Sequence, residues 1–312
     1  MTQSTPGTVQ YEAKPFLKWA GGKSQLLRQL SSFYPAELAA GRIHRYVEPF
    51  LGGGAVFLDI AQRFDVAQVY LFDINEEIIL AYTVVKQDPQ ALIELLAEHR
   101  EQYTMLTEDA RAGYYYAIRE RYNAHRRRLD FKAYSDAWVE RAADMIFLNK
   151  TCFNGLYRVN SRGFFNVPFG RYKKPVIFEE QNIWRISELL QRATLAVGAF
   201  DSCAAVVDDR TFVYFDPPYR PISTTSSFTS YARHRFDDDD QRALGAFFRK
   251  LAKSTAAKLM LSNSDPKNLD PDDDFFDRLY AGFHIQRVYA NRMINSKADS
   301  RGKITEILVT NY

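Results

Sequence analysis

Thr211-Phe212-Val213-Tyr214-Phe215-Asp216-Pro217-Pro218-Tyr219 is the stretch that decides the fold. Its first five residues are apolar or β-branched and predict a fully buried strand. Two successive prolines end this strand, because proline has no N–H to donate to a strand ladder. Asp216 and Tyr219 are therefore expected on a stiff corner at the carboxyl end of a central strand, where open α/β sheets bind ligands.

This corner offers groups that suit a planar base carrying an amine. The base would stack on Tyr219, and its exocyclic amine would donate one hydrogen to Asp216 and the other to the carbonyl of Pro217. These two acceptors would draw the nitrogen lone pair out of ring conjugation and direct it at an electrophile. The alternative is that Pro217 and Pro218 only mark the junction between a strand and a loop.

Composition narrows the class of protein. The 312 residues suffice for a sizeable core in one large domain or two. We find no signal peptide and no run of eighteen apolar residues, so we expect a soluble cytoplasmic protein without a membrane partner. Cys152 and Cys203 have no zinc or disulfide spacing, and the five histidines are scattered. We therefore assign no metal.

The charge distribution says more than the net charge of +3. Residues 111–175 hold 14 Lys or Arg against 5 Asp or Glu, whereas the acidic clusters lie later, at 237–240 and 270–274. A basic middle with interleaved tyrosine and phenylalanine is typical of a nucleic-acid-binding face. A solvated protein surface is the alternative.

A glycine turn follows the polar and loose N-terminal residues 1–13. Pro15-Phe16-Leu17-Lys18-Trp19-Ala20-Gly21-Gly22-Lys23-Ser24 precedes an amphipathic run at 25–33 that predicts a helix. This is not a phosphate-binding P-loop, because Leu17 stands where its first glycine belongs. The turn is better explained as backbone that approaches a ligand at a helix start, with Lys23 supplying charge.

A strand, glycine turn and helix come next, at 45–50, 51–54 and 55–64. A second strand at 68–72 ends at Asp73, which is well placed to bind ribose hydroxyls or to cap the following helix. Phe57 stands where a dinucleotide fingerprint has its third glycine, and this weakens the prediction of a pyrophosphate site.

Helical periodicity then continues without a strand pattern, at 91–100, 114–122 and 137–147, which predicts an inserted helical subdomain. Residues 149–170 change character: they contain Arg, Asn and aromatic residues but no acid, with turn residues at 160–163. These features predict a β-hairpin. A β-ribbon of this composition fits the major groove, where Arg pairs with guanine and Asn with adenine.

The remaining pattern predicts helices at 183–191 and 237–253 and strands at 194–197 and 258–263. A closing antiparallel pair is expected at 283–290 and 305–310. We interpret the polar stretch 220–231 as a lid and 291–302 as a basic loop. The fold class is therefore α/β, with helices on both faces of a mainly parallel sheet.

Several of these segments resemble motifs of the Dam-like adenine-specific DNA methyltransferases. The Phe16-to-Lys23 stretch, the glycine turn, the 149–175 segment and Asp216-Pro217-Pro218-Tyr219 follow that family's alpha order, and the resemblance spans nearly the whole chain. It is nearest to the DpnM type. It implies a Rossmann-like fold, S-adenosylmethionine (SAM) as methyl donor with S-adenosylhomocysteine as product, and catalysis by Asp216, Pro217, Pro218 and Tyr219.

The resemblance also implies binding residues and domains. The implied cofactor site comprises Trp19, Ala20, Gly21, Lys23, Glu48, Phe50, Gly52, Gly54, Asp73, Ile74, Phe200, Asp201 and Asp216. The implied DNA contacts, at GATC, are Lys18, Asn154, Leu156, Arg158, Arg162, Asn166 and Pro168. We expect a SAM-binding catalytic domain at 14–75 and 176–312 and a target-recognition insertion at 76–175.

Alternatives remain open at this stage. An RNA-adenine or protein-glutamine methyltransferase would share the tetrapeptide, although the hairpin argues for duplex DNA. A SAM-responsive DNA-binding protein without catalysis would have no need of Asp216, and a dinucleotide oxidoreductase would need the missing third glycine. We expect a monomer. The sequence does not distinguish a solitary enzyme from one paired with a restriction endonuclease for the same site.

Overall fold

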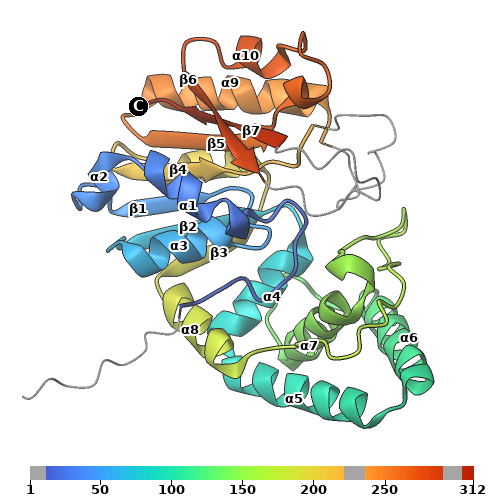
Figure 1. The fold of residues 1–312 in the computed structure, drawn as a ribbon. Coiled ribbons are helices and arrows are strands. Elements are labelled where there is room, and N and C mark those ends of the chain that lie inside the picture. The colour runs from blue at the N-terminus through green and yellow to red at the C-terminus, as the bar shows by residue number, and fades with distance from the viewer. Residues whose placement is uncertain (1–11, 221–235, 291–303) are drawn as a thin grey trace, which may run out of the picture.

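A single mixed sheet forms the centre of the molecule (Figure 1). The computed structural model describes residues 12–220, 236–290 and 304–312. In the described residues seven strands are ordered β3-β2-β1-β4-β5-β7-β6. The first five pair in parallel, and β7 pairs antiparallel with both β5 and the edge strand β6. The strands are β1 (Arg45–Glu48), β2 (Gln68–Asp73), β3 (Ala193–Val197), β4 (Thr211–Phe215), β5 (Lys258–Ser264), β6 (His284–Ala290) and β7 (Ile304–Thr310).

Both faces of the sheet are covered by helices. Successive side chains of a strand point to opposite faces. Phe212 and Tyr214 of β4 accordingly join one core cluster, while Val213 and Phe215 join the other. The first face packs on α1 (Leu27–Leu30), α3 (Ala55–Arg63), α4 (Glu76–Gln87) and α8 (Glu180–Leu190), and the second on α9 (Asp238–Ser254) and α10 (Phe275–Leu279). The predicted α/β class, with helices on both faces, is confirmed.

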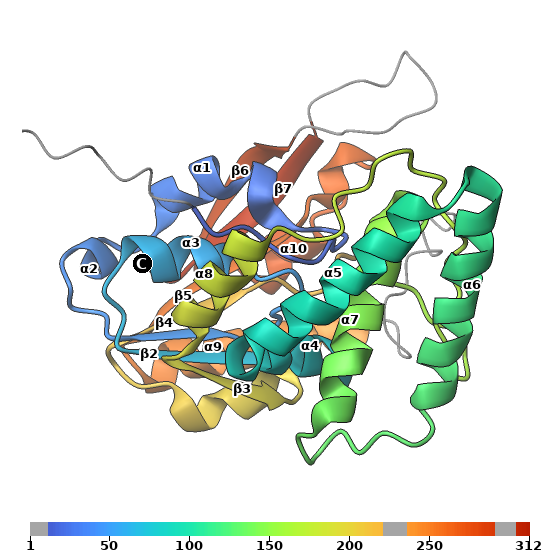
Figure 2. The same ribbon diagram turned by 90° about the horizontal axis from the view of Figure 1, so that it is seen from below.

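Three long helices lie beside the sheet, as Figure 2 shows. They are α5 (Pro89–Met105), α6 (Glu108–His125) and α7 (Asp136–Thr151), and α7 packs against both of the others. The preceding helix α4 contacts α7 as well as β2 and β3. The helices expected at 91–100, 114–122 and 137–147 are thus confirmed, each extending a few residues further. The domain boundaries stay a prediction.

Two predicted elements take a different form. Residues 25–33 do not form one helix: α1 spans four residues between the 3₁₀ turns Lys23–Gln25 and Ser31–Phe33, and the short α2 (Ala36–Ala39) follows. The hydroxyls of Ser31 and Ser32 donate to the carbonyls three residues earlier, at 3.1 and 2.7 Å, and such bonds compete with a continuing helix.

The predicted hairpin forms, but it has few strand-pairing hydrogen bonds. It pairs through two isolated antiparallel bridges, Cys152 with Phe169 and Val159 with Phe165, and not through a continuous ladder. The interpretations of 1–11, of the lid beyond Arg220 and of the basic loop at 291–302 concern residues outside those that the structure describes. Within the described residues no helix has the length and apolar character needed to cross a bilayer.

Candidate active site

The sheet's strand order places a cavity at its switch point. β1 pairs with β2 on one side and with β4 on the other. The chain therefore continues from β1 toward β2 and from β4 toward β5, in opposite directions along the sheet. In open α/β sheets the crevice at such a point, outside the carboxyl ends of the strands, is where ligands bind. A cavity of about 770 Å³ lies here.

The cavity's lining joins segments that are distant in sequence. Of the residues predicted for cofactor binding and catalysis, all but one line it: Trp19, Ala20, Gly21, Lys23, Glu48, Phe50, Gly52, Gly54, Asp73, Ile74, Phe200, Asp216, Pro217, Pro218 and Tyr219. The exception is Asp201, which is exposed on the 3₁₀ helix Phe200–Val206 and is not part of the lining. The structure gives the positions of these residues, and their roles in cofactor binding and catalysis stay predictions.

Asp216 lies at the end of β4 and is held by two partners. Its Oδ1 is 2.6 Å from the buried Lys23 ammonium and accepts a hydrogen bond of 3.2 Å from the hydroxyl of Ser262. Tyr214 in turn lies 2.7 Å from the same hydroxyl. Burial raises the pKa of Asp216, while the positive charge of Lys23 lowers it. Lys23, assigned to the cofactor from sequence, therefore contacts the corner itself.

Tyr219 is fixed through both its ring and its hydroxyl. The ammonium of Lys23 lies 4.6 Å from the ring centroid, within the range of a cation–π contact. The hydroxyl donates to Glu306 on β7, whose pKa is raised by burial. Sequence reasoning missed Glu306. Its only signal was an acid in the middle of the apolar strand at 305–310.

Asp73 is held in place by the glycine turn after β1. Its two carboxylate oxygens accept the backbone N–H groups of Gly52, at 2.9 Å, and Asn75, at 2.8 Å. Burial raises its pKa to about 6, and these two bonds oppose the rise. Asn75 caps α4 by accepting from the backbone of Glu77. The helix cap is therefore Asn75, and the oxygens of Asp73 keep lone pairs for a ligand in the cavity.

The glycines of this turn allow neighbouring side chains to approach closer than any other residue would permit. A Cβ on Gly52, whose φ is +46°, would lie 2.9 Å from the indole of Trp19, and one on Gly54, at φ +66°, would lie 2.3 Å from the hydroxyl of Tyr82. Nearby, buried Glu48 accepts from the Tyr46 hydroxyl at 2.6 Å, and burial raises its pKa well above the usual range.

Two pairs of stacked aromatic rings contribute to the lining of the cavity. Trp19 stacks on Tyr157 of the hairpin region, with centroids 5.4 Å apart, and Phe50 stacks on Phe200 at 5.9 Å. Tyr157 and Arg126 also line the cavity, although the sequence analysis gave neither a role there. The cavity therefore extends from the sheet to the end of α6 and to the segment that follows α7.

The predicted DNA-contacting residues lie on and beside the hairpin. Arg158 donates from Nε to Asn166 Oδ1 at 2.8 Å, so these two candidates hold each other. Asn154 is exposed in the left-handed region at φ 55°, and Arg162 and Pro168 are exposed, while Leu156 is half-buried.

Lys18 is exposed on the N-terminal glycine segment, with its ammonium 4.7 Å from the ring of Tyr172. Its backbone N–H and carbonyl both bond to the side chain of Asn149, which ties this segment to α7. A Cβ on Gly155 would lie 2.2 Å from the Lys18 side chain, so the two segments are in close contact. Among the described residues, no group of three or more His, Cys, Asp or Glu is arranged to hold a metal.

The strand order with antiparallel β7, the glycine turn after β1 and the Asp-Pro-Pro-Tyr corner after β4 define a Rossmann-like methyltransferase. Residues 19–294 match the family described as D12 class N6 adenine-specific DNA methyltransferase, and the chain belongs to this family. It is an adenine-specific DNA methyltransferase.

Similar proteins include type II methyltransferases and DNA adenine methylases. The type II methyltransferase M.MjaIII of Methanocaldococcus jannaschii is 50% identical over 302 residues, covering 96% of this chain and 100% of the relative. The type II methyltransferase M1.LlaDCHI of Lactococcus lactis subsp. cremoris is 39% identical, covering 96% and 95%. The DNA adenine methylase of Escherichia coli (strain K12) is 33% identical, covering 95% and 94%.

Proposed function

We propose that this methyltransferase uses SAM to methylate the exocyclic amine of an adenine that has left the DNA duplex, within the site GATC. The observation that carries the proposal is the meeting of two motifs in one cavity. Asp216 and Tyr219, which suit a base, line the same space as Gly52 and Asp73, which suit a nucleoside-containing cofactor.

The residues of the cofactor end fit SAM. The carboxylate of Asp73 is oriented by two backbone N–H groups and is suited to ribose hydroxyls. Phe50 and Phe200 offer ring surface to an adenine, and Gly52 lets the turn approach the indole of Trp19 closely. When bound, SAM supplies an electrophilic methyl group and leaves as S-adenosylhomocysteine.

The residues of the catalytic corner orient the target. In our proposal Asp216 accepts one hydrogen of the adenine amine and the Pro217 carbonyl accepts the other. No donor among the described residues bonds to that carbonyl. Tyr219 stacks on the base through the ring face opposite Lys23, and stacking offsets part of the few kcal/mol that extrusion costs. Asp216 need not act as a strong base if the proton leaves after transfer.

The hairpin and Lys18 face the duplex in this proposal. Arg158 reads a guanine, with its guanidinium oriented by Asn166, and Lys18 reaches the other guanine. Asn154 fills the gap left by the extruded base, Leu156 and Pro168 touch base edges, and Arg162 contacts the DNA. The basic excess over 111–175 supports a DNA-binding face. The assignment of GATC rests on the hairpin's resemblance to the Dam-like family.

The enzyme's setting also belongs to the proposal. Two relatives carry the name type II methyltransferase, which supports a restriction endonuclease for the same site as a partner. We propose that the enzyme acts as a monomer in the cytoplasm, where the DNA is.

The test is incubation with SAM and plasmid, followed by mapping of methylated adenines by sequence context. We expect methylation at the adenine of GATC and none on matched RNA or protein substrates. Asp216→Ala should abolish methylation while SAM and DNA still bind, because the amine loses its acceptor. The exposed Asp65→Ala is the control and should methylate normally. Near-wild-type turnover by Asp216→Ala would refute the proposed role, and methylation elsewhere would refute the site.

A further inference from the structure

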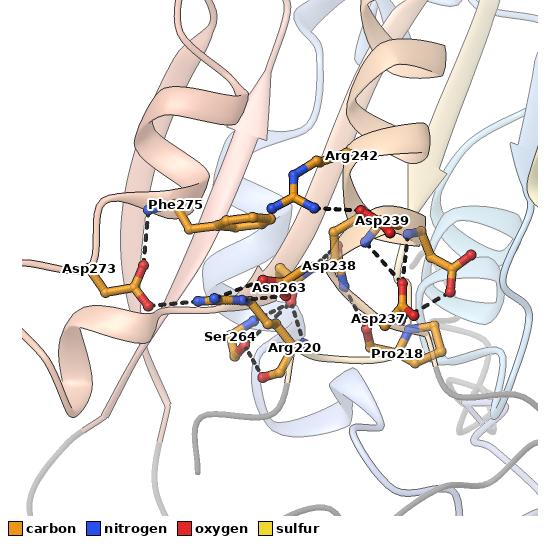
Figure 3. Close-up of polar contacts among 12 residues, drawn as sticks. Pro218, Arg220, Asp237, Asp238, Asp239, Arg242, Asn263, Ser264, Asp273 and Phe275 are labelled. Carbon is orange, nitrogen blue, oxygen red and sulfur yellow. Dashed lines mark hydrogen bonds and ion pairs between the residues drawn. The ribbon is translucent and has the colours of Figure 1, made fainter. Parts of the chain in front are cut away.

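Behind the catalytic corner, a buried pair of amide side chains bonds to the backbone on both sides of Tyr219 (Figure 3). Gln241 of α9 donates to the carbonyl of Pro218 at 3.0 Å. Asn263 of β5 accepts from the backbone N–H of Arg220 at 3.4 Å. The residues before and after Tyr219 are thus each tied to a different element.

The two amides also bond to each other. Asn263 donates through Nδ2 to Oε1 of Gln241 at 3.0 Å, and both side chains are completely buried. The neighbouring Ser264 donates its backbone N–H to Asn263 at 2.8 Å and its hydroxyl to the carbonyl of Arg220 at 3.1 Å. A buried polar network of this kind is rigid when its members are satisfied, and costly when one is removed.

The side chain of Arg220 adds a second set of contacts that hold the same segment. Its guanidinium bonds to Asp238 at 2.7 and 3.0 Å and to Asp273 at 2.6 Å, and lies 4.3 Å from the ring centroid of Phe275 (Figure 3). Asp238 begins α9, which is fixed by the capping box of Asp237 and Asp240. Gln241 therefore sits on a helix end whose position is well determined.

We infer that Gln241 and Asn263 are positioning residues that set the placement of Tyr219, and that methyl transfer depends on them although neither touches the base. Gln241 takes the carbonyl of Pro218 and leaves that of Pro217 for the amine. This inference rests on the proposed function of the corner.

Methyl transfer is sensitive to small displacements of the reacting groups. A reacting nitrogen must be held in a near-attack geometry, and a misplacement of about 1 Å can cost on the order of 100-fold in rate. Tyr219 follows two prolines, so its backbone has little freedom on that side. On the other side, Asn263 and Ser264 fix the peptide groups of Arg220. Loss of the bond from Gln241 to Pro218, or of the bond from Arg220 to Asn263, lets the Tyr219 ring move away from Asp216. The cofactor end of the cavity is not disturbed.

The experiment compares Gln241→Leu with Asn182→Leu. Asn182 is a matched control because it is also a buried amide and does not line the cavity. Its side chain accepts from the backbone N–H of Lys14 and donates to the carbonyl of Lys14, both at 2.8 Å. We expect Gln241→Leu to lower kcat at least tenfold with KM for SAM within twofold of wild type. Asn182→Leu should lower the thermal midpoint of unfolding about as much as Gln241→Leu does, but its kcat should stay within twofold of wild type.

A second variant covers a Gln241→Leu protein that fails to fold. Asn263→Ala removes both the acceptor for Arg220 and the donor to Gln241 without adding a charge, and we expect the same split between kcat and KM. A kcat within twofold of wild type, or a loss no larger than that of Asn182→Leu, overturns the inference. Tyr219→Ala and Asp216→Ala are measured alongside. If they stay active the proposed function fails, whereas if they are inactive and Gln241→Leu is active only the positioning role fails.

Discussion

In the proposed mechanism, the ion pair of Lys23 and Asp216 sets the pH range of methyl transfer. Burial raises the pKa of Asp216, so the carboxyl takes up its proton at a higher pH than an exposed aspartate, whose pKa is about 3.9. The protonated carboxyl loses acceptor capacity toward the amine. In the proposed mechanism, activity is therefore present above this raised pKa and lost as the pH falls through it.

Replacing Lys23 by Met should move that acid limb upward. An opposite charge in contact typically lowers a carboxyl pKa by about 1 to 3 units, so its removal should raise the limb by a similar amount. The measurement is kcat against pH at saturating SAM and DNA. Lys258→Met is the control: it removes an equal charge that pairs with Glu37, and the limb should not move. A limb at or below the wild-type position in Lys23→Met would contradict the prediction.

At the same scale, the sequence predicted the cavity residues that lie within motifs. Trp19, Gly52, Asp73 and Asp216 each stand in a short stretch whose pattern indicates a site. Contacts across the sheet were not predictable in this way. Glu306 meets Tyr219 only because β7 inserts antiparallel between β5 and β6. Gln241 and Asn263 likewise come together through packing of α9 on β5, and no local spacing encodes that contact.

At the scale of elements, the turn between β1 and α3 depends on Gly54. Its φ of +66° is in the left-handed region, and an added Cβ would lie 2.3 Å from the hydroxyl of buried Tyr82. We expect Gly54→Ala to destabilise the protein by about 1 to 3 kcal/mol through overpacking and backbone strain, and to weaken SAM binding. Urea unfolding and SAM titration measure the two effects.

Gly113→Ala is the control for that substitution. Gly113 lies within α6 with no atom near its would-be Cβ, so alanine should stabilise the helix by about 0.5 to 1 kcal/mol. The same chemical change is thus expected to act with opposite sign at two places. A Gly54→Ala protein as stable as wild type would show that the turn tolerates a side chain.

Element prediction succeeded where burial alone decides the structure. The strand at 211–215 is buried on both faces, so its apolar run had one interpretation, and β4 has those bounds. At 25–33 the hydroxyls of Ser31 and Ser32 bond to the backbone and divide the helix into short turns. Side-chain bonding of this kind competes with helix periodicity, which therefore overestimated the helix length.

At the scale of the whole molecule, a buried ionic cluster joins α4, which packs on the sheet, to α6 and α7. Glu77 of α4 follows the loop after Asp73 and is 2% exposed. It accepts two hydrogen bonds from the fully buried Arg141 of α7, at 2.7 and 2.5 Å, and one from Arg126 at the end of α6. Arg126 also bonds to Glu76 at 2.5 Å. The start of α4, beside the cavity, is thus bound to the end of α6 and to α7.

Removing one member of this cluster should destabilise the entire chain. Glu77→Gln leaves the Arg141 guanidinium buried without its counter-charge, and breaking a buried pair in this way typically costs about 3 to 5 kcal/mol. Because α4 packs on the sheet and the cluster ties it to α6 and α7, we expect one cooperative urea transition shifted to lower concentration. The exposed Glu188→Gln, which breaks a pair with Arg185 on α8, should cost less than about 0.5 kcal/mol. If Glu77→Gln instead produces two transitions, with α6 and α7 unfolding first, the cluster joins units that are stable separately. A loss below about 1 kcal/mol would show that the cluster contributes little to holding them together.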